Sequence, residues 1–318
     1  MLRKILISII TFCIITSGIY INSKRYEISS PMEDLEYKKK IITSSKNLTY
    51  KLENLRPLVG PNELERFIRE NNDNPEIYTP SEENIKKGIY QANLHMHTTN
   101  SDGQARVEYI LDQAESYAKK NLKGKPFYLS ITDHNTILGA KELIEVLQKN
   151  PQKYKNIKVI CGIEIFTAYN NSSVAKRPVD IHVLGWCINP YDKFLNKEFY
   201  KKNLKDKWNR QLPDRDFDFV ITELSNYGLI GIAHPARYID FLGKENKNYI
   251  KELLQHYKSK NKNKVCYLEG YYQVYPLIIK NYDEEFKNLL DYINLEAKAQ
   301  GICRTGSTDV HGYSIFKK

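Results

Sequence analysis

The stretch Asn93–Gly103, NLHMHTTNSDG, places two histidines one residue apart, and Asp102 follows shortly after them. Alternate side chains of a β-strand point to the same face, so His95 and His97 would project together to one side. Converging imidazoles are favoured ligands of zinc, iron and related ions. A hydrogen-bonded pair in a core would also explain this spacing on its own. The stretch therefore predicts a strand whose end carries metal ligands, if other ligands meet it there.

Seven apolar runs of strand length alternate with segments that have helical periodicity. Apolar residues recur at helical spacing in 107–122, 137–148 and 282–299. Strands that alternate with helices predict parallel pairing and an α/β fold, either an open doubly wound sheet or a closed barrel. Seven such units favour the barrel. The predicted strands are 89–96, 127–132, 157–163, 180–187, 229–233, 265–272 and 302–307.

Unusual polar residues follow these predicted strands. In an α/β barrel, functional residues gather at the carboxyl ends of the strands. Six of the seven histidines lie at such ends, and only His256 lies elsewhere. This arrangement favours one metal site over scattered structural histidines. The residues concerned are His95, His97, Asp133, His134, Glu164, His182, His234, Asp309 and His311.

The N-terminus has the pattern of a targeting segment. Arg3 and Lys4 precede an apolar run that ends near Ile21. We interpret residues 1–23 as a signal peptide or a single membrane anchor, and either one predicts an exported, extracytoplasmic domain. Residues 24–88 are Lys-rich and broken by prolines, and we expect a polar helical extension there. Residues 89–318 form the predicted catalytic domain.

The charge and the cysteines exclude little. The formal net charge of +10 favours anionic partners, but lysines occur throughout the chain, which indicates a compositional bias rather than a basic patch. No segment interleaves aromatic and arginine residues as a nucleic-acid reader would, and none indicates a stable protein partner. The four cysteines outside the leader lie in apolar runs without a CxxC spacing, so we expect buried free thiols.

Six motifs occur in the order found in PHP (polymerase and histidinol phosphatase) domains, and residues 89–318 resemble that family. The resemblance implies a distorted (β/α)7 barrel and a trinuclear cluster of divalent ions (Zn, Mn or Fe). In such a cluster a metal-bridging hydroxide hydrolyses phosphate esters. The motifs are HMHTTNSDG (95–103), ITDHN (131–135), GIE (162–164), IHVLG (181–185), AHPARY (233–238) and GSTDVHG (306–312).

The resemblance also assigns residues to roles. A first ion would bind His95, His97, Glu164 and Asp309, a second Glu164, His182 and His234, and a third Asp102, His134 and His311. Asp133 would support a histidine, and Glu269 would have a supporting or a direct role. Arg237 would contact a phosphate oxygen, or form only a surface ion pair. Glu164, Asp309 and Arg237 are the predicted catalytic residues.

Two other functions fit parts of the pattern. An amidohydrolase-like metal-dependent hydrolase would share the His-x-His opening, but it usually bridges its ions with a modified lysine where this chain has Glu164. A non-catalytic, membrane-attached metal-binding module would need fewer ligands than the chain provides.

The expected substrate is a phosphorylated small molecule or a nucleic-acid end. The membrane is a further partner if the leader is uncleaved. The chain ends soon after His311, where a closed barrel would usually finish with a covering helix, so we expect the N-terminal extension to cover that side unless the chain is truncated.

Overall fold

The computed structural model describes residues 31–44, 55–175, 178–199, 215–236, 246–262, 264–272 and 282–316. The predicted leader and Arg237 lie outside these residues. Eight strands form one sheet in the order β1-β2-β3-β4-β6-β7-β8, and β5 pairs with β3. The strands are β1 (Ala92–Asn93), β2 (Phe127–Ile131), β3 (Ile157–Tyr169), β4 (Val179–Trp186), β5 (Arg215–Asp216), β6 (Leu229–Ile232), β7 (Tyr267–Tyr272) and β8 (Cys303–Ser307).

The sheet is not parallel throughout, so the prediction of parallel pairing was wrong for β4. Strands β1, β2 and β3 pair in parallel, as do β6, β7 and β8. Strand β4 is antiparallel to both β3 and β6. It follows β3 through a short connection and forms a hairpin with it, because a direct return leaves no room for a crossover helix.

The two end strands approach each other and nearly close the sheet into a barrel. Met96 and Val310 form a parallel bridge just beyond β1 and β8. The backbone N–H of His97 donates to the carbonyl of Val310 at 2.8 Å, and Asn93 Nδ2 donates to Thr308 Oγ1 at 2.6 Å. These bonds bring the two ends of the domain, residues 93–97 and 308–310, to one place.

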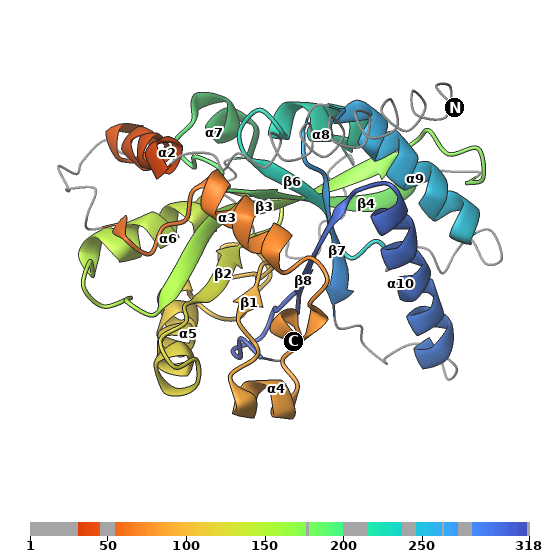
Figure 1. Ribbon diagram of the computed structural model, residues 1–318. Helices are drawn as coiled ribbons and strands as arrows, with labels where there is room; N and C mark the ends of the chain where they lie inside the picture. The colour runs from red at the N-terminus through yellow and green to blue at the C-terminus, as the bar shows by residue number, and fades with distance from the viewer. Residues whose placement is uncertain are drawn as a thin grey trace, which may run out of the picture.

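Helices surround the outer face of the sheet (Figure 1). Helix α5 shows why they pack there: Val107, Ile110, Leu111 and Ala114 are buried at helical spacing along one side. The helices around the sheet are α5 (Val107–Asn121), α6 (Leu138–Lys149), α7 (Lys193–Phe199), α8 (Phe217–Leu224), α9 (Asn246–Lys260) and α10 (Tyr282–Ala299). In the described part of the chain, no helix is both long and apolar enough to cross a membrane.

The N-terminal extension closes one end of the barrel. Its elements are α2 (Pro31–Ser44), α3 (Pro61–Glu70), the 3-10 helix η2 (Pro75–Tyr78) and α4 (Glu82–Lys87). Leu64 and Phe67 of α3 and Tyr78 of η2 belong to the core cluster that contains Trp186 inside the sheet. Figure 1 shows α3 in front of the strands. Residues 55–78 therefore cover one end of the barrel, and we call them the floor.

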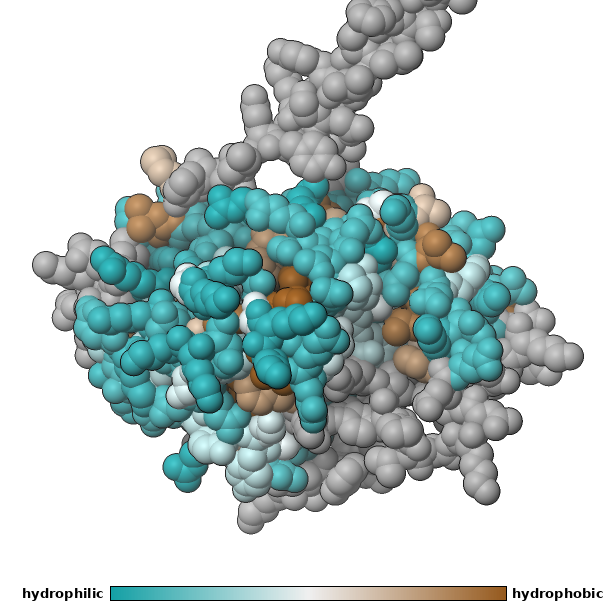
Figure 2. Space-filling view, turned by 60° about the horizontal axis from the view of Figure 1, so that its bottom comes forward, coloured by the Kyte–Doolittle hydropathy of each residue, from teal (hydrophilic) through white to brown (hydrophobic). Residues whose placement is uncertain are grey.

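Helix α2 is attached to this floor. The carboxylate of Asp34 accepts hydrogen bonds from the backbone N–H groups of Asn62 (3.2 Å) and Glu63 (3.1 Å) at the start of α3. An acidic side chain stabilises a helix N-terminus because it satisfies free N–H groups and interacts with the helix dipole. Tyr37 of α2 donates to the carbonyl of Ile188 at 3.1 Å. The described part of the face in Figure 2 is mainly hydrophilic, with apolar residues in small separate groups.

Candidate metal centre

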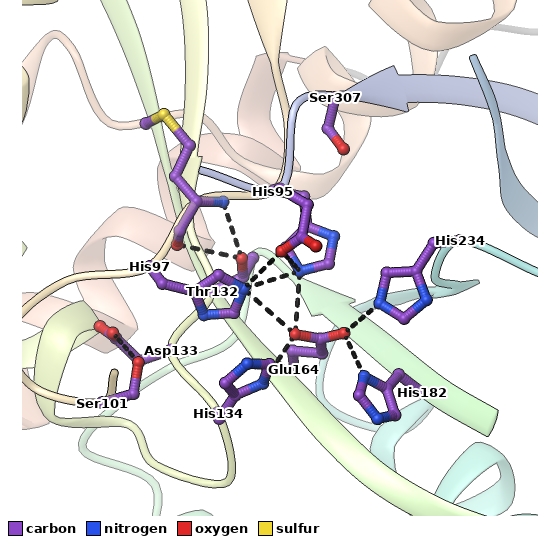
Figure 3. Close-up of polar contacts among 12 residues, drawn as sticks. His95, His97, Ser101, Thr132, Asp133, His134, Glu164, His182, His234 and Ser307 are labelled. Carbon is purple, nitrogen blue, oxygen red and sulfur yellow. Dashed lines mark hydrogen bonds and ion pairs between the residues drawn. The ribbon is translucent and has the colours of Figure 1, made fainter. Parts of the chain in front are cut away.

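Glu164 lies at the centre of the site, on β3, and its side chain is fully buried. Five imidazole rings surround its carboxylate. Oε1 lies 2.7 Å from His182 Nδ1 and 2.9 Å from His234 Nε2. Oε2 lies 2.8 Å from His134 Nδ1, 2.9 Å from His95 Nε2 and 3.2 Å from His97 Nε2. Figure 3 shows these rings pointing toward the carboxylate from different strands and loops.

Asp309 completes a first group of donors with His95, His97 and Glu164. Its Oδ1 lies 3.1 Å from His97 Nε2 and 3.5 Å from His95 Nε2. One nitrogen or oxygen from each of these four buried residues falls within 4.8 Å of the others. The first predicted ligand set is therefore brought together. Asp309 has a φ of 49°, a strained conformation for a non-glycine residue that is common at functional sites.

A second group of donors surrounds the other oxygen of Glu164. His182 and His234 both approach Oε1. The donors here that could share a cation are those of His134, Glu164 and His182, a group that does not include His234. We predicted Glu164 and His182 at strand ends, but both lie within strands, because β3 continues to Tyr169 and β4 pairs with it from Val179. His182 still reaches the site because β4 runs in the opposite direction.

The third group contains Asp102, His134 and His311, as the resemblance implies, and also His97. Asp102 Oδ1 lies 3.3 Å from His311 Nε2 and 3.6 Å from His134 Nε2. The two imidazoles approach within 3.3 Å. His97 lies within reach of both the first and the third group, so the three groups form one continuous cluster.

Asp133 holds the loop that carries Asp102. Its buried carboxylate accepts hydrogen bonds from the N–H of Thr98 (2.7 Å), from Thr98 Oγ1 (2.7 Å) and from Ser101 Oγ (2.5 Å). Asp133 was expected to support a histidine directly. It instead fixes the loop, because its side chain points toward residues 98–101 and not toward an imidazole.

Glu269, on β7, for which we expected a supporting or a direct role, lies beside the first group of donors. Its carboxylate is fully buried and lies 3.1 Å from His95 Nδ1, on the opposite side of the ring from Glu164. It also accepts a hydrogen bond from the backbone N–H of His234 at 2.8 Å and one from the hydroxyl of Ser307. In the sequence, Glu269 stands out as an acidic residue within the apolar run 265–272 that predicts this strand.

Burial and mutual charge set the pKa values in the cluster. Burial alone would raise the pKa of Glu164, but the nearby imidazoles of His95, His134 and His182 outweigh it, and the net result lies well below the ordinary value. Burial lowers the pKa of His134 to about 3 and that of His234 to about 4. The pKa of His97 is raised to about 9, because Asp309 and Glu164 outweigh the effect of burial.

The donor set fits divalent metal ions. His95 Nε2 and His97 Nε2 lie 3.0 Å apart, beside carboxylate oxygens of Glu164 and Asp309. Two ring nitrogens this close cannot both be protonated without repulsion, whereas a cation between them and the carboxylates satisfies all four. Mixed imidazole and carboxylate ligation suits Zn, Mn and Fe. His256 lies apart from the cluster and pairs with Asp218 at 2.5 Å.

Comparison with known proteins shows similarity to a protein family and to a characterised relative. The family model of the PHP domain matches residues 93–303, so it includes all the clustered histidines and carboxylates except Asp309 and His311. The DNA polymerase/3'-5' exonuclease PolX of Bacillus subtilis (strain 168) is 29% identical over 118 residues, which cover 34% of this chain. The chain spans only 19% of the length of that relative.

Proposed function

Because the chain belongs to the PHP domain family, we propose that it is a metal-dependent phosphoesterase. The observation that carries this proposal is the convergence of five imidazole rings on the two oxygens of one buried carboxylate, Glu164. A buried carboxylate surrounded by so many nitrogen donors is well placed to bridge two cations. The groups of donors consist of histidine, aspartate and glutamate, which favours this function over an amidohydrolase-like site with a modified lysine.

The proposed site holds three divalent ions. His95, His97, Glu164 and Asp309 would bind the first ion. Glu164, His182 and His234 would bind the second, and Asp102, His134 and His311 the third. Two features support this arrangement: Glu164 faces different histidines with each oxygen, and His97 adjoins the third group as well as the first.

The ions, when bound, would lower the pKa of water toward about 7 and neutralise charge on the phosphoryl oxygens. The protein would hold and orient the substrate's phosphoryl group against them. The pKa values of His134 and His234 lie far below 7, so both rings are neutral and able to ligate at physiological pH. No side chain then needs to form a covalent intermediate.

Asp309 and Arg237 are the remaining proposed catalytic residues. Asp309 Oδ1 faces His97 and lies 3.5 Å from His311 Nδ1, a position suited to passing a proton between the ligands and a leaving group. Arg237 follows the His234 motif in the sequence, and we propose that its guanidinium binds a phosphate oxygen.

The proposed substrates are a phosphorylated small molecule or a nucleic-acid end. The second class agrees with the 3'-5' exonuclease named in the similar PolX protein. An exported location, through the leader at residues 1–23, would make scavenging of extracytoplasmic phosphate esters the natural role.

A phosphate-release screen tests this function. The purified protein should be stripped of metal, reloaded separately with Mn, Zn or Fe, and assayed with 4-nitrophenyl phosphate, bis(4-nitrophenyl) phosphate and a short oligonucleotide. We expect hydrolysis of at least one ester, dependent on added metal and lost on chelation. Failure of all three loaded forms to hydrolyse any of these esters would contradict the proposal.

A further inference from the structure

We propose that Glu269 is a positioning residue that sets the ligand geometry of two of the three ion sites at once. The inference rests on the proposed metal-dependent function. Glu269 reaches the cluster from β7, and it contacts His95, His234 and Ser307, which lie on or next to β1, β6 and β8. One buried side chain therefore joins four segments of the barrel at the site.

The first consequence concerns the tautomer of His95. Its Nδ1 lies 3.1 and 3.2 Å from the two oxygens of Glu269, and its Nε2 lies 2.9 Å from Glu164. A carboxylate can only accept, so Nδ1 must carry the proton that it shares with Glu269. The lone pair then resides on Nε2, which is the nitrogen that faces the proposed ion. Such partners of ligating histidines fix the ring and increase its basicity.

The second consequence concerns the backbone of His234. This residue has a φ of 28°, a left-handed conformation that costs free energy for a non-glycine residue. Its backbone N–H donates to Glu269 Oε2 at 2.8 Å, and its Nε2 lies 2.9 Å from Glu164. The bond to Glu269 compensates for the unfavourable conformation that aims this ring into the cluster.

Glu269 is not itself placed as a ligand. Oε1 lies near His95 Nδ1 and Ser307 Oγ, and Oε2 lies near His95 Nδ1 and the His234 N–H, so the lone pairs of both oxygens are directed at these donors. Its role would pass through the two histidines, each of which belongs to a different proposed ion site. The third group, around Asp102 and His311, has no contact with it among the described residues.

The variant Glu269→Gln tests the inference. Glutamine keeps the volume but removes the negative charge, so the charge-assisted bonds from His95 Nδ1 and from the His234 N–H are both weakened, and its NH2 group places a donor against one of them. We expect metal affinity to fall about 10- to 100-fold at two of the three sites, with the third unchanged. Titration of metal-free protein with Co²⁺, followed by its visible absorption and by elemental analysis after dialysis, measures this without an activity assay.

The matched control is Glu115→Gln. Glu115 also accepts from a backbone N–H and from a side chain, those of Asn156 at 2.9 and 2.6 Å, but it lies on α5 away from the cluster. Its Co²⁺ titration should equal that of the wild type. If Glu269→Gln titrates like this control, the inference is overturned.

If Glu269→Gln does not fold, as judged by circular dichroism, Ser307→Ala decides the question. This change removes one donor that orients Glu269, and it should weaken the same two sites by a smaller factor; an unchanged titration would overturn the inference.

The proposed function is tested separately. Wild-type protein that binds Co²⁺ but hydrolyses no ester would defeat the phosphoesterase proposal and leave the positioning role standing.

Discussion

Glu164 carries a single negative charge at the meeting point of five imidazole rings. Glu164→Gln would keep the shape of this side chain and remove the charge. We expect the purified variant to retain less metal than the wild type and to lose at least about 100-fold in phosphoesterase activity, because a neutral amide cannot bridge two cations. Elemental analysis and the phosphate-release assay measure the two effects. Full metal content together with full turnover would contradict this prediction.

The histidine pKa values predict how the stability of the metal-free protein depends on pH. His97 has a raised pKa of about 9, so the stability it contributes is complete below the unfolded value of about 6.5 and is lost as the pH rises through 9. His134 and His234 have lowered values of about 3 and 4, so the stability they contribute is lost as the pH falls below about 6.5. The free energy of unfolding should therefore be greatest near pH 6.5.

Urea denaturation of metal-free protein between pH 5 and 9 measures this dependence. His97→Asn serves as the test variant: it should flatten the decrease on the alkaline side, and it should also weaken the acidic loss, because the charge of His97 helps burial to lower the pKa of His134. A wild-type free energy of unfolding that stays constant from pH 6.5 to 9 would show that His97 does not gain a proton on folding.

At the residue scale, the sequence contained enough information to select side chains that meet in space. Histidine is rare in this chain, so its recurrence after apolar runs was a strong signal. Glu269 was harder to place, since a single acidic residue in a strand does not reveal which ring it faces. Its partners include a backbone N–H, and the sequence does not show which backbone N–H group a side chain will contact.

The loop at residues 97–103 brings Asp102 to the third group. At Gly103 this loop passes close to the backbone of His97. A Cβ at this position would lie 2.5 Å from the carbonyl carbon and oxygen of His97. Gly103→Ala should therefore displace the loop and reduce the metal content by about one ion, with a smaller loss of affinity at the first site because the clash involves the backbone of His97. Elemental analysis after dialysis measures this change.

Gly124→Ala is the matched control for this loop. Gly124 has a φ of 89° and an open surrounding, so alanine there strains the backbone without a clash and away from the site. The control should lose stability, by about 1 kcal/mol or more, but keep its metal. Equal metal content in the two variants would contradict the role given to the loop.

The direction of a strand, as β4 shows, cannot be predicted from its apolar pattern. A short apolar run predicts a strand, but it does not say whether the strand is parallel to its neighbours. The direction depends on the connection, and the residues between β3 and β4 are too few for a crossover helix. The predicted strands 157–163 and 180–187 left 16 residues between them, enough for a crossover, so the hairpin follows only from the extension of β3 to Tyr169 in the structure.

For the whole molecule, the floor and the metal cluster lie at different ends of the barrel. Leu64 of α3 is fully buried in the interior cluster beneath the strands. Leu64→Ala should cost about 2 to 5 kcal/mol of stability through lost burial and the cavity left behind, with metal affinity unchanged. Leu295→Ala is the control, because Leu295 is 68% exposed. Chemical denaturation and Co²⁺ titration separate the two properties, and a metal affinity that falls with Leu64→Ala would show that floor and site are coupled.

Metal ions should contribute to the stability of the entire barrel, because the cluster joins segments from both ends of the domain. His95 and His97 lie near its start and Asp309 near its end, and all three face one point. An ion that binds only the folded state stabilises it by about 4 kcal/mol at a thousand times its Kd. We expect chelation with EDTA to lower the Tm by several degrees, and re-addition of Mn or Zn to restore it. Glu164→Gln should show a much smaller shift under the same treatment. A wild-type Tm that does not respond to EDTA, in protein shown by elemental analysis to have lost its metal, would mean that these side chains hold the barrel together without ions.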